Sequence, residues 1–125
     1  MKIAKGHQAV MPYLILKNAE AFIAFTKNVF GATEIFKSYR DNDNKFIMHA
    51  EVQINGCNIM FADVNEFYGV ANSNLFIYVN DADETAAIAL QNGAKIINEL
   101  ADQDYGRSGG IEDPFGNVWW ITSMK

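Results

Sequence analysis

The sequence is poor in cysteine and proline and has no long hydrophobic run. It holds 1 cysteine and 2 prolines in 125 residues. Cys57 has no partner for an internal disulfide, which is typical of a protein of the reducing cytoplasm. No apolar stretch approaches the roughly 20 residues of a membrane-spanning helix. The first seven residues also lack the apolar segment of a secretory signal. We therefore expect a cytoplasmic protein without a membrane partner.

Basic residues are few and scattered. The chain has 10 lysines and arginines against 15 acidic residues, a net charge of -5. Because proteins that bind nucleic acids gather basic residues on one surface, this distribution argues against such a partner. Half of the residues are hydrophobic and 13% are aromatic, so the chain can bury a core. We expect a single domain over residues 1–125.

What the sequence does contain is an internal repeat. Residues 14–35 and 76–97 show the same order of strand, turn, helix and strand, and a shift of 62 residues superimposes them. A repeat of this kind predicts two similar halves with a site between them. The matching pairs are Ile15 and Ile77, Asn18 and Asn80, Ala24 and Ala86, Gly31 and Gly93, Ala32 and Ala94, and Ile35 and Ile97.

The order of predicted elements is βαβββ, twice, in modules of about residues 9–63 and 73–122. This order predicts the α+β fold class, with the tandem units forming an open, barrel-like mixed sheet and the helices outside. The inside of such a trough is a natural place for a ligand. In the first module we expect strands at 9–16, 32–40, 46–54 and 57–63, with a helix ending before Gly31. In the second we expect strands at 75–79, 94–99, 109–112 and 118–122, a helix at 83–92, and a loop at 102–107.

The strand at residues 46–54 carries the first candidate site. Side chains alternate along a strand, so one face holds His49, Glu51 and Gln53. His49 and Glu51 could act as a general base with a carboxylate neighbour, or as two ligands of a displaced metal site. The alternative is a polar pair that faces solvent. The opposite face is expected to hold Phe46, Met48, Ala50, Val52 and Ile54.

The repeat and two motifs near the C-terminus resemble the vicinal oxygen chelate superfamily. The motifs are Tyr105-Gly106-Arg107 and the run 113–121, Asp-Pro-Phe-Gly-Asn-Val-Trp-Trp-Ile. This superfamily includes glyoxalase I, bleomycin-resistance proteins and extradiol dioxygenases. The Asp-Pro-Phe-Gly-Asn turn before two tryptophans, with His49-Ala50-Glu51, is most similar to its PhnB-like branch. The resemblance covers essentially the whole chain.

The resemblance also implies where a metal would be held, and those positions carry unsuitable residues. Metal-dependent members use His or Gln on the first strand of each half and Glu on the last strand. These positions fall at Pro12, Asn74 and Trp120, with the remaining one near residues 58–60. Proline and tryptophan cannot bind a metal and asparagine alone is a poor ligand. We therefore predict no cofactor and no metal ligand, and a divalent metal only if the ligands are relocated.

The remaining positions suggest an apolar binding site. If the expected alignment of the halves holds, the trough is lined by Leu14, Met60, Phe76, Tyr78 and Trp120, which suits an apolar or aromatic small molecule. For each of these residues the alternative is core packing.

Four further residues have expectations of their own. Tyr105 and Arg107 lie near the expected mouth, where Arg107 could bind an anion or pair with Asp102, Asp104 or Glu112. His7 is expected to be solvated, and Cys57 to be a buried structural thiol.

Two functions follow from these observations, and a third reading stays open. The first is a metal-free, small-molecule binding protein that, like the binding members it resembles, is a homodimer. The alternative is a glyoxalase-like or dioxygenase-like enzyme that uses relocated ligands, or His49 and Glu51 as an acid–base pair. The third is a structural domain whose trough is filled by its own side chains.

Overall fold

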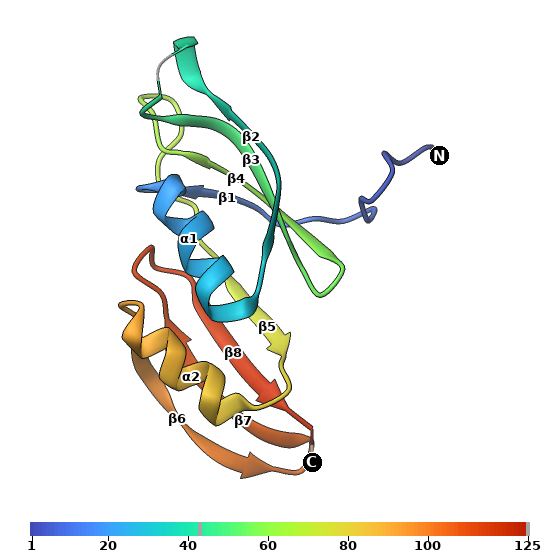
Figure 1. Ribbon diagram of the computed structural model, residues 1–125, viewed down its shortest axis with the longest axis vertical. Coiled ribbons are helices and arrows are strands. Elements are labelled where there is room, and N and C mark those ends of the chain that lie inside the picture. Colours follow the sequence, from blue (N-terminus) through green and yellow to red (C-terminus); the bar gives the residue numbers. More distant parts are fainter. Residues whose placement is uncertain (43, 125) are drawn as a thin grey trace. The chain divides into compact units, whose positions relative to one another are not determined.

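The computed structural model describes residues 1–42 and 44–124, which form two compact units. The first unit comprises Met1–Lys27 and Gly31–Ala71, and the second comprises Asn28–Phe30 and the chain from Asn72 onward. Figure 1 labels the elements. They are β1 (Tyr13–Leu16), α1 (Ala19–Phe30), β2 (Thr33–Tyr39), a 3-10 turn η1 (Arg40–Asn42), β3 (Ile47–Ile54), β4 (Cys57–Asp63), β5 (Asn74–Tyr78), α2 (Ala82–Gln91), β6 (Lys95–Gln103), β7 (Gly106–Glu112) and β8 (Val118–Ser123).

The first unit is a four-stranded sheet in the order β1-β4-β3-β2, with β1 parallel to β4 and the other pairs antiparallel. Helix α1 begins where the Asn18 side chain accepts a hydrogen bond from the Ala21 amide, and it ends at Gly31, which has a φ of 68°. A left-handed cap of this kind suits glycine because it has no Cβ. The ring of Phe22 meets the edge of Phe61 on β4, with 4.8 Å between the ring centroids. Aromatic packing therefore joins α1 to one face of this sheet.

Strand β3 corrects the predicted alternation at its start. Ile47, Ala50, Val52 and Ile54 are buried, whereas Met48 is 54% exposed. The pairing of β2 with β3 shifts between Ser38–His49 and Tyr39–Ile47, which leaves Met48 in a β-bulge. The extra residue reverses the face of the sheet on which the preceding side chains lie. Phe46 and Met48 therefore do not join the core as predicted. The placement of His49, Glu51 and Gln53 on the other face agrees with their contacts, described below.

The second unit repeats the topology, with strand order β5-β8-β7-β6. Its helix α2 is capped by Asp81, which accepts from the Glu84 amide at 3.1 Å, and not by Asn80 as the repeat predicted. The buried residues of α2 are small: Ala82, Ala86 and Ala89. Their spacing of three to four residues gives one narrow stripe, which packs α2 closely against its sheet.

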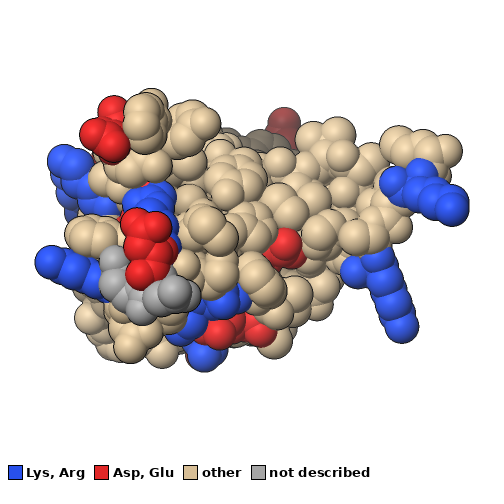
Figure 2. All heavy atoms as spheres, turned by 90° about the horizontal axis from the view of Figure 1, so that it is seen from above, with Lys and Arg blue, Asp and Glu red and all other residues tan. Residues whose placement is uncertain are grey.

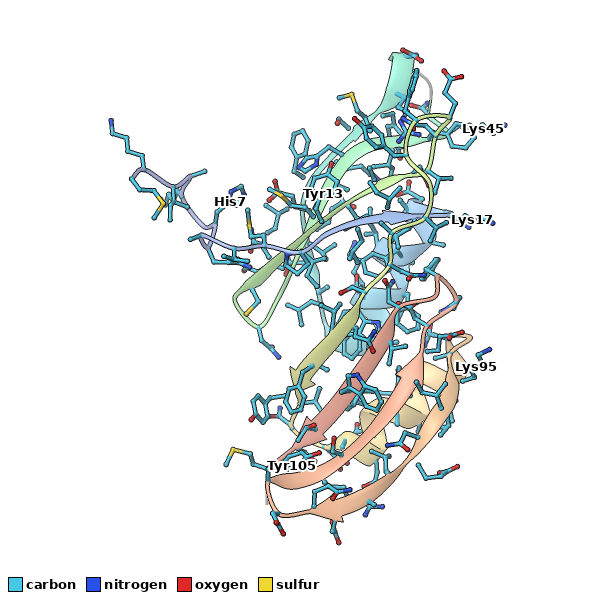
Figure 3. All side chains as sticks on the ribbon, turned by 180° about the vertical axis from the view of Figure 1, so that it is seen from behind. His7, Tyr13, Lys17, Lys45, Lys95 and Tyr105 are labelled. Carbon is cyan, nitrogen blue, oxygen red and sulfur yellow. The ribbon has the colours of Figure 1, made fainter. Side chains whose placement is uncertain are left out.

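The predicted loop at 102–107 is a hairpin. Strands β6 and β7 pair as far as Gln103 and Gly106, so only two residues turn the chain. Figure 3 shows Tyr105 at the end of this hairpin. Gly106, Gly109 and Gly110 lie close together in the sequence, which is typical of either tight backbone turns or a mobile flap. In the structure, Gly109 and Gly110 are strand residues where an added Cβ would meet a neighbour within 3.0 Å.

The predicted α+β class and the tandem βαβββ order are therefore confirmed, with two four-stranded mixed sheets. The structure corrects the alignment of the two halves. Leu14 is 3% exposed on the α1 face of its sheet, while Phe76, its partner under the 62-residue shift, is 53% exposed. By the face that it presents, Leu14 corresponds to Leu75 or Ile77, and the helix N-caps Asn18 and Asp81, which lie 63 residues apart, favour Ile77. Because a slip of one residue turns a strand over, the sequence alignment placed Leu14 on the wrong face.

Within residues 1–42 and 44–124, no helix is long and apolar enough to cross a membrane. Charged side chains lie singly or in mixed groups on the face drawn in Figure 2, and basic residues form no continuous patch there.

Candidate functional site

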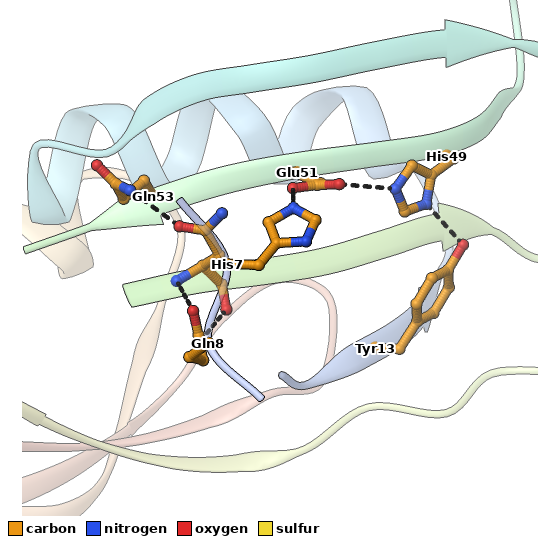
Figure 4. A network of polar contacts seen from close by, with 7 residues as sticks. His7, Gln8, Tyr13, His49, Glu51 and Gln53 are labelled. Atoms are coloured by element: carbon orange, nitrogen blue, oxygen red, sulfur yellow. Dashed lines mark hydrogen bonds and ion pairs between the residues drawn. The ribbon is translucent and has the colours of Figure 1, made fainter. Parts of the chain in front are cut away.

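The first candidate site is a hydrogen-bonded cluster on the sheet of the first unit. We call His7, Tyr13, His49 and Glu51 the relay cluster (Figure 4). Glu51 accepts from His7 Nε2 at 2.8 Å through one carboxylate oxygen and from His49 Nε2 at 3.1 Å through the other. The other ring nitrogen of His49, Nδ1, lies 2.9 Å from the Tyr13 hydroxyl. One carboxylate thus connects two imidazoles and a phenol.

Strand pairing explains why these residues meet. Glu51 on β3 lies opposite Met60 on β4, and Met60 lies opposite Tyr13 on β1. Residues directly opposite in neighbouring strands share a face, so Tyr13, Met60 and Glu51 form one row across the sheet. On β2, Phe36 also lies opposite Glu51 and extends this row. Met60, a predicted ligand contact, is half-buried beside the relay cluster, whereas Leu14 belongs to the core on the other face.

The N-terminal segment completes the cluster. Gln8 holds this segment to β4, because its amide donates to the Asn58 carbonyl at 2.9 Å and accepts from the Asn58 amide at 3.3 Å. His7 then reaches Glu51, and its side chain is 22% exposed. The expectation that His7 is solvated was therefore wrong. Nothing in the sequence pointed to this contact, since the two residues lie 44 positions apart.

Glu51 is the most enclosed member, at 6% exposed. Burial raises the pKa of a carboxyl group, but the hydrogen bonds from His49 and His7 outweigh it and hold the pKa of Glu51 below its usual value. Glu51 therefore stays ionised at neutral pH. For Tyr13, burial raises the pKa above its usual value, with the positive charge of Arg40 opposing this. The phenol therefore stays protonated, and the cluster pairs a carboxylate with proton donors.

The second candidate site is a set of exposed rings on β5 and β8. We call Phe76, Tyr78 and Trp120 the aromatic face. Phe76 and Tyr78 are 53% and 57% exposed, and their rings meet edge to face at 5.1 Å. Trp120 lies opposite Phe76 in the sheet. The flanking residues Trp119 and Ile121 are buried, so the aromatic face is the one turned away from the core of this unit.

A glycine gives Trp120 its place on this face. A Cβ on Gly110 would come within 2.7 Å of the indole, so the ring lies directly over the β7 backbone. The Trp120 indole N–H donates to the Asn74 side-chain oxygen at 3.2 Å. Position and orientation of the ring are thereby both fixed.

The residues at the implied metal positions do not fit a metal. The Asn74 oxygen is already an acceptor for the Trp120 N–H, and an indole has no lone pair to offer a cation. Within the described part of the chain, no group of three or more His, Cys, Asp and Glu residues could hold an ion. The relay cluster brings two imidazoles to one carboxylate, but both direct an N–H toward it. We therefore derive no step that requires a metal.

Two predicted residues lie outside both sites. Arg107 directs its guanidinium to Asp83, at 2.7 and 3.2 Å, and to Asp102 at 3.5 Å. The hydrogen bond that Arg107 donates to Asp83 is the main cause that raises the pKa of Arg107. The guanidinium group of Arg107, which could bind an anion, is therefore already paired with carboxylates of the protein. Tyr105 is exposed at the hairpin end, and Cys57 is exposed rather than buried.

Comparison with known proteins now identifies the class. Residues 7–121 match the model of the glyoxalase/bleomycin resistance protein/dioxygenase superfamily, so the chain belongs to that superfamily. An uncharacterised protein of Mycobacterium bovis is 32% identical over 123 residues, which cover 89% of this chain and 80% of that protein.

Solved structures share the fold at lower identity. TioX from Micromonospora sp. ML1 is 22% identical, with a TM-score of 0.71 over 94% of this chain and 97% of its own. A PhnB protein from Bacillus cereus, a putative 3-demethylubiquinone-9 3-methyltransferase, is 19% identical. Its TM-score is 0.71 over 93% of this chain and 99% of its own.

Proposed function

We propose that the protein binds a flat, apolar or aromatic small molecule on its aromatic face. The observation that carries this proposal is the exposure of Phe76 and Tyr78 beside Trp120, on a sheet whose other face is packed. Exposed apolar side chains that lie next to one another are more frequent at binding sites than elsewhere on a protein surface. Stacked or edge-to-face ring contacts contribute about 0.5–1.5 kcal/mol beyond the area that they bury. The superfamily includes a drug-resistance protein, which is consistent with a binding role.

The two tryptophans make this proposal measurable. Trp119 is 1% exposed, whereas Trp120 is half-buried on the aromatic face. We expect a neutral nitroaromatic, 4-nitroanisole, to quench part of the tryptophan emission in a saturable way. Tyr78→Ala should weaken binding about 2- to 10-fold, the loss expected for one ring contact.

Tyr68→Ala is the matched control, because Tyr68 is 64% exposed on the other unit and should leave the affinity unchanged. Linear, unsaturable quenching in the unmodified protein would contradict the proposal. An equal effect of the two substitutions would contradict it as well.

The relay cluster favours a second candidate function, a metal-free enzyme that uses His49 and Glu51 as acid and base. The carboxylate–imidazole contact at 3.1 Å supports it, because such a pair can move a proton. If assays for glyoxalase-type isomerisation or aromatic-ring cleavage detect turnover, His49→Ala and Glu51→Ala should abolish it. Gln53→Ala, on the same strand and face, should not. Unchanged turnover in the first two variants would exclude this role.

A further inference from the structure

The hydroxyl of Tyr13 is the accessible end of the relay cluster. Tyr13 is 48% exposed, whereas Glu51 at the other end of the chain of contacts is 6% exposed. Tyr13 was not among the residues that the sequence suggested, since the alignment of the halves favoured Leu14. Tyr13 is therefore the member of the relay cluster that is most open to a small molecule, since the side chain of His49 is 25% exposed.

The contacts of Glu51 fix the direction of each hydrogen bond in the cluster. An ionised carboxylate can only accept, so His49 Nε2 must carry a hydrogen. In a neutral imidazole the other nitrogen is then an acceptor. His49 Nδ1 therefore accepts, and the Tyr13 hydroxyl must donate to it at 2.9 Å. The hydroxyl hydrogen of Tyr13 is thus donated to His49, and the Tyr13 oxygen presents only lone pairs to solvent.

Aromatic and apolar side chains lie beside Tyr13 and its partner His49. The rings of Tyr13 and His49 stack with 5.5 Å between centroids, and Phe36 lies 5.8 Å from His49 on the other side. Met60 lies beside Tyr13 in the same row of the sheet. A ligand group bound here would thus have an apolar body and one polar atom.

We propose that Tyr13 is a hydrogen-bond-accepting subsite that selects small molecules carrying an aromatic hydroxyl group. This subsite lies in the first unit and does not depend on the aromatic face. A ligand phenol would donate to the Tyr13 oxygen, while an ether or carbonyl at the same place would find no donor. Glu51 acts as a positioning residue, because it sets the tautomer of His49 and through it the direction of the Tyr13 hydroxyl.

Phenol and anisole test the proposal, since anisole carries a methyl group in place of the hydroxyl hydrogen that the subsite would accept. We would titrate each into the protein at pH 8.5, which favours neutral imidazole, and follow the NMR signals of the Tyr13 ring. Phenol should bind about 3- to 10-fold more tightly than anisole, the effect of one net hydrogen bond. Tyr13→Phe should abolish this preference, and Tyr68→Phe should retain it.

Several results would overturn the proposal. These are equal affinities for phenol and anisole, a preference that survives in Tyr13→Phe, or no change of the Tyr13 signals up to tens of millimolar phenol. Trp120 emission reports the aromatic face separately, so failure here is distinguishable from failure of the proposed function.

The tautomer of His49 provides an independent measurement. Nitrogen-15 chemical shifts of the imidazole should show hydrogen on Nε2 in the unmodified protein. Glu51→Gln should admit the Nδ1–H form, because an amide can donate as well as accept, and it should lower the preference for phenol. An Nδ1–H form in the unmodified protein would make Tyr13 a donor to solvent and would refute the proposal.

Discussion

Asp113 is the acceptor that holds the turn between β7 and β8 together. One of its carboxylate oxygens accepts from the backbone amides of Phe115 and Asn117, each at 2.9 Å. The other accepts from the Asn117 side chain and from the Trp119 indole, also at 2.9 Å. Asp113 is 3% exposed, so each of these donors would be costly to leave unpaired. The motif that carried the family resemblance therefore has a structural role.

We predict that Asp113→Asn lowers the free energy of unfolding by roughly 2 to 4 kcal/mol. The new amide keeps one oxygen for the backbone, but its NH₂ group faces two other donors, on Asn117 and Trp119. Urea unfolding measures the change. Asp104→Asn, an exposed residue of the β6–β7 turn, is the matched control and should leave stability unchanged. A loss below 1 kcal/mol in the Asp113 variant would contradict this account.

The same variant has a predicted pH dependence. Burial raises the pKa of Asp113 above its usual value, with the hydrogen bond from Trp119 the largest opposing effect. When the pKa of a carboxyl group is higher in the folded state than in the unfolded state, protonation of that group stabilises the folded state. Its contribution to stability is complete below the unfolded pKa and is lost as pH rises through the folded pKa. The loss of unfolding free energy caused by Asp113→Asn should therefore become smaller between pH 4 and neutrality. A loss that becomes larger as pH rises would contradict the raised pKa of Asp113.

Among the elements, the helices and hairpins follow from local sequence, whereas the bulge does not. Asn18 and Gly31 are standard capping residues, and both cap α1 as predicted. Asn55-Gly56 predicts the β3–β4 turn, where both residues have positive φ. No sequence feature marks the bulge at Met48, because the residues around it alternate in a way that fits the strand pairing with or without a bulge. It is set by the pairing with β2.

The predicted site divides in a similar way. Alternation along a single strand is enough to place Phe76 with Tyr78, and His49 with Glu51, on shared faces without knowledge of the neighbouring strands. His7 and Tyr13 were missed because their partners lie 44 and 36 residues away. Contacts at such separations depend on which strands are neighbours and in which register. A single sequence leaves that pairing open.

At the scale of the whole molecule, we predict that the chain forms a homodimer in solution. The resemblance to binding members of the superfamily implies a dimer. The segment before β5 also exposes large apolar side chains, with Phe67 and Val70 at 79% and 47%. Exposed groups of this size are more frequent at interfaces than on isolated monomers. Light scattering at micromolar concentration should give the mass of two chains, and the mass of one chain would contradict the prediction.

The unequal spacing of the two halves has an evolutionary consequence. The N-caps of the two helices are Asn18 and Asp81, and Gly31 and Gly93 follow the helices with φ of 68° and 96°. Between N-cap and glycine, the second half is therefore one residue shorter than the first. If a duplicated segment gave rise to both halves, one codon was gained or lost between these points, and α2 is indeed the shorter helix. Inside either strand the same event would have turned a hydrophobic face toward water, so selection could keep the length difference only where it is found.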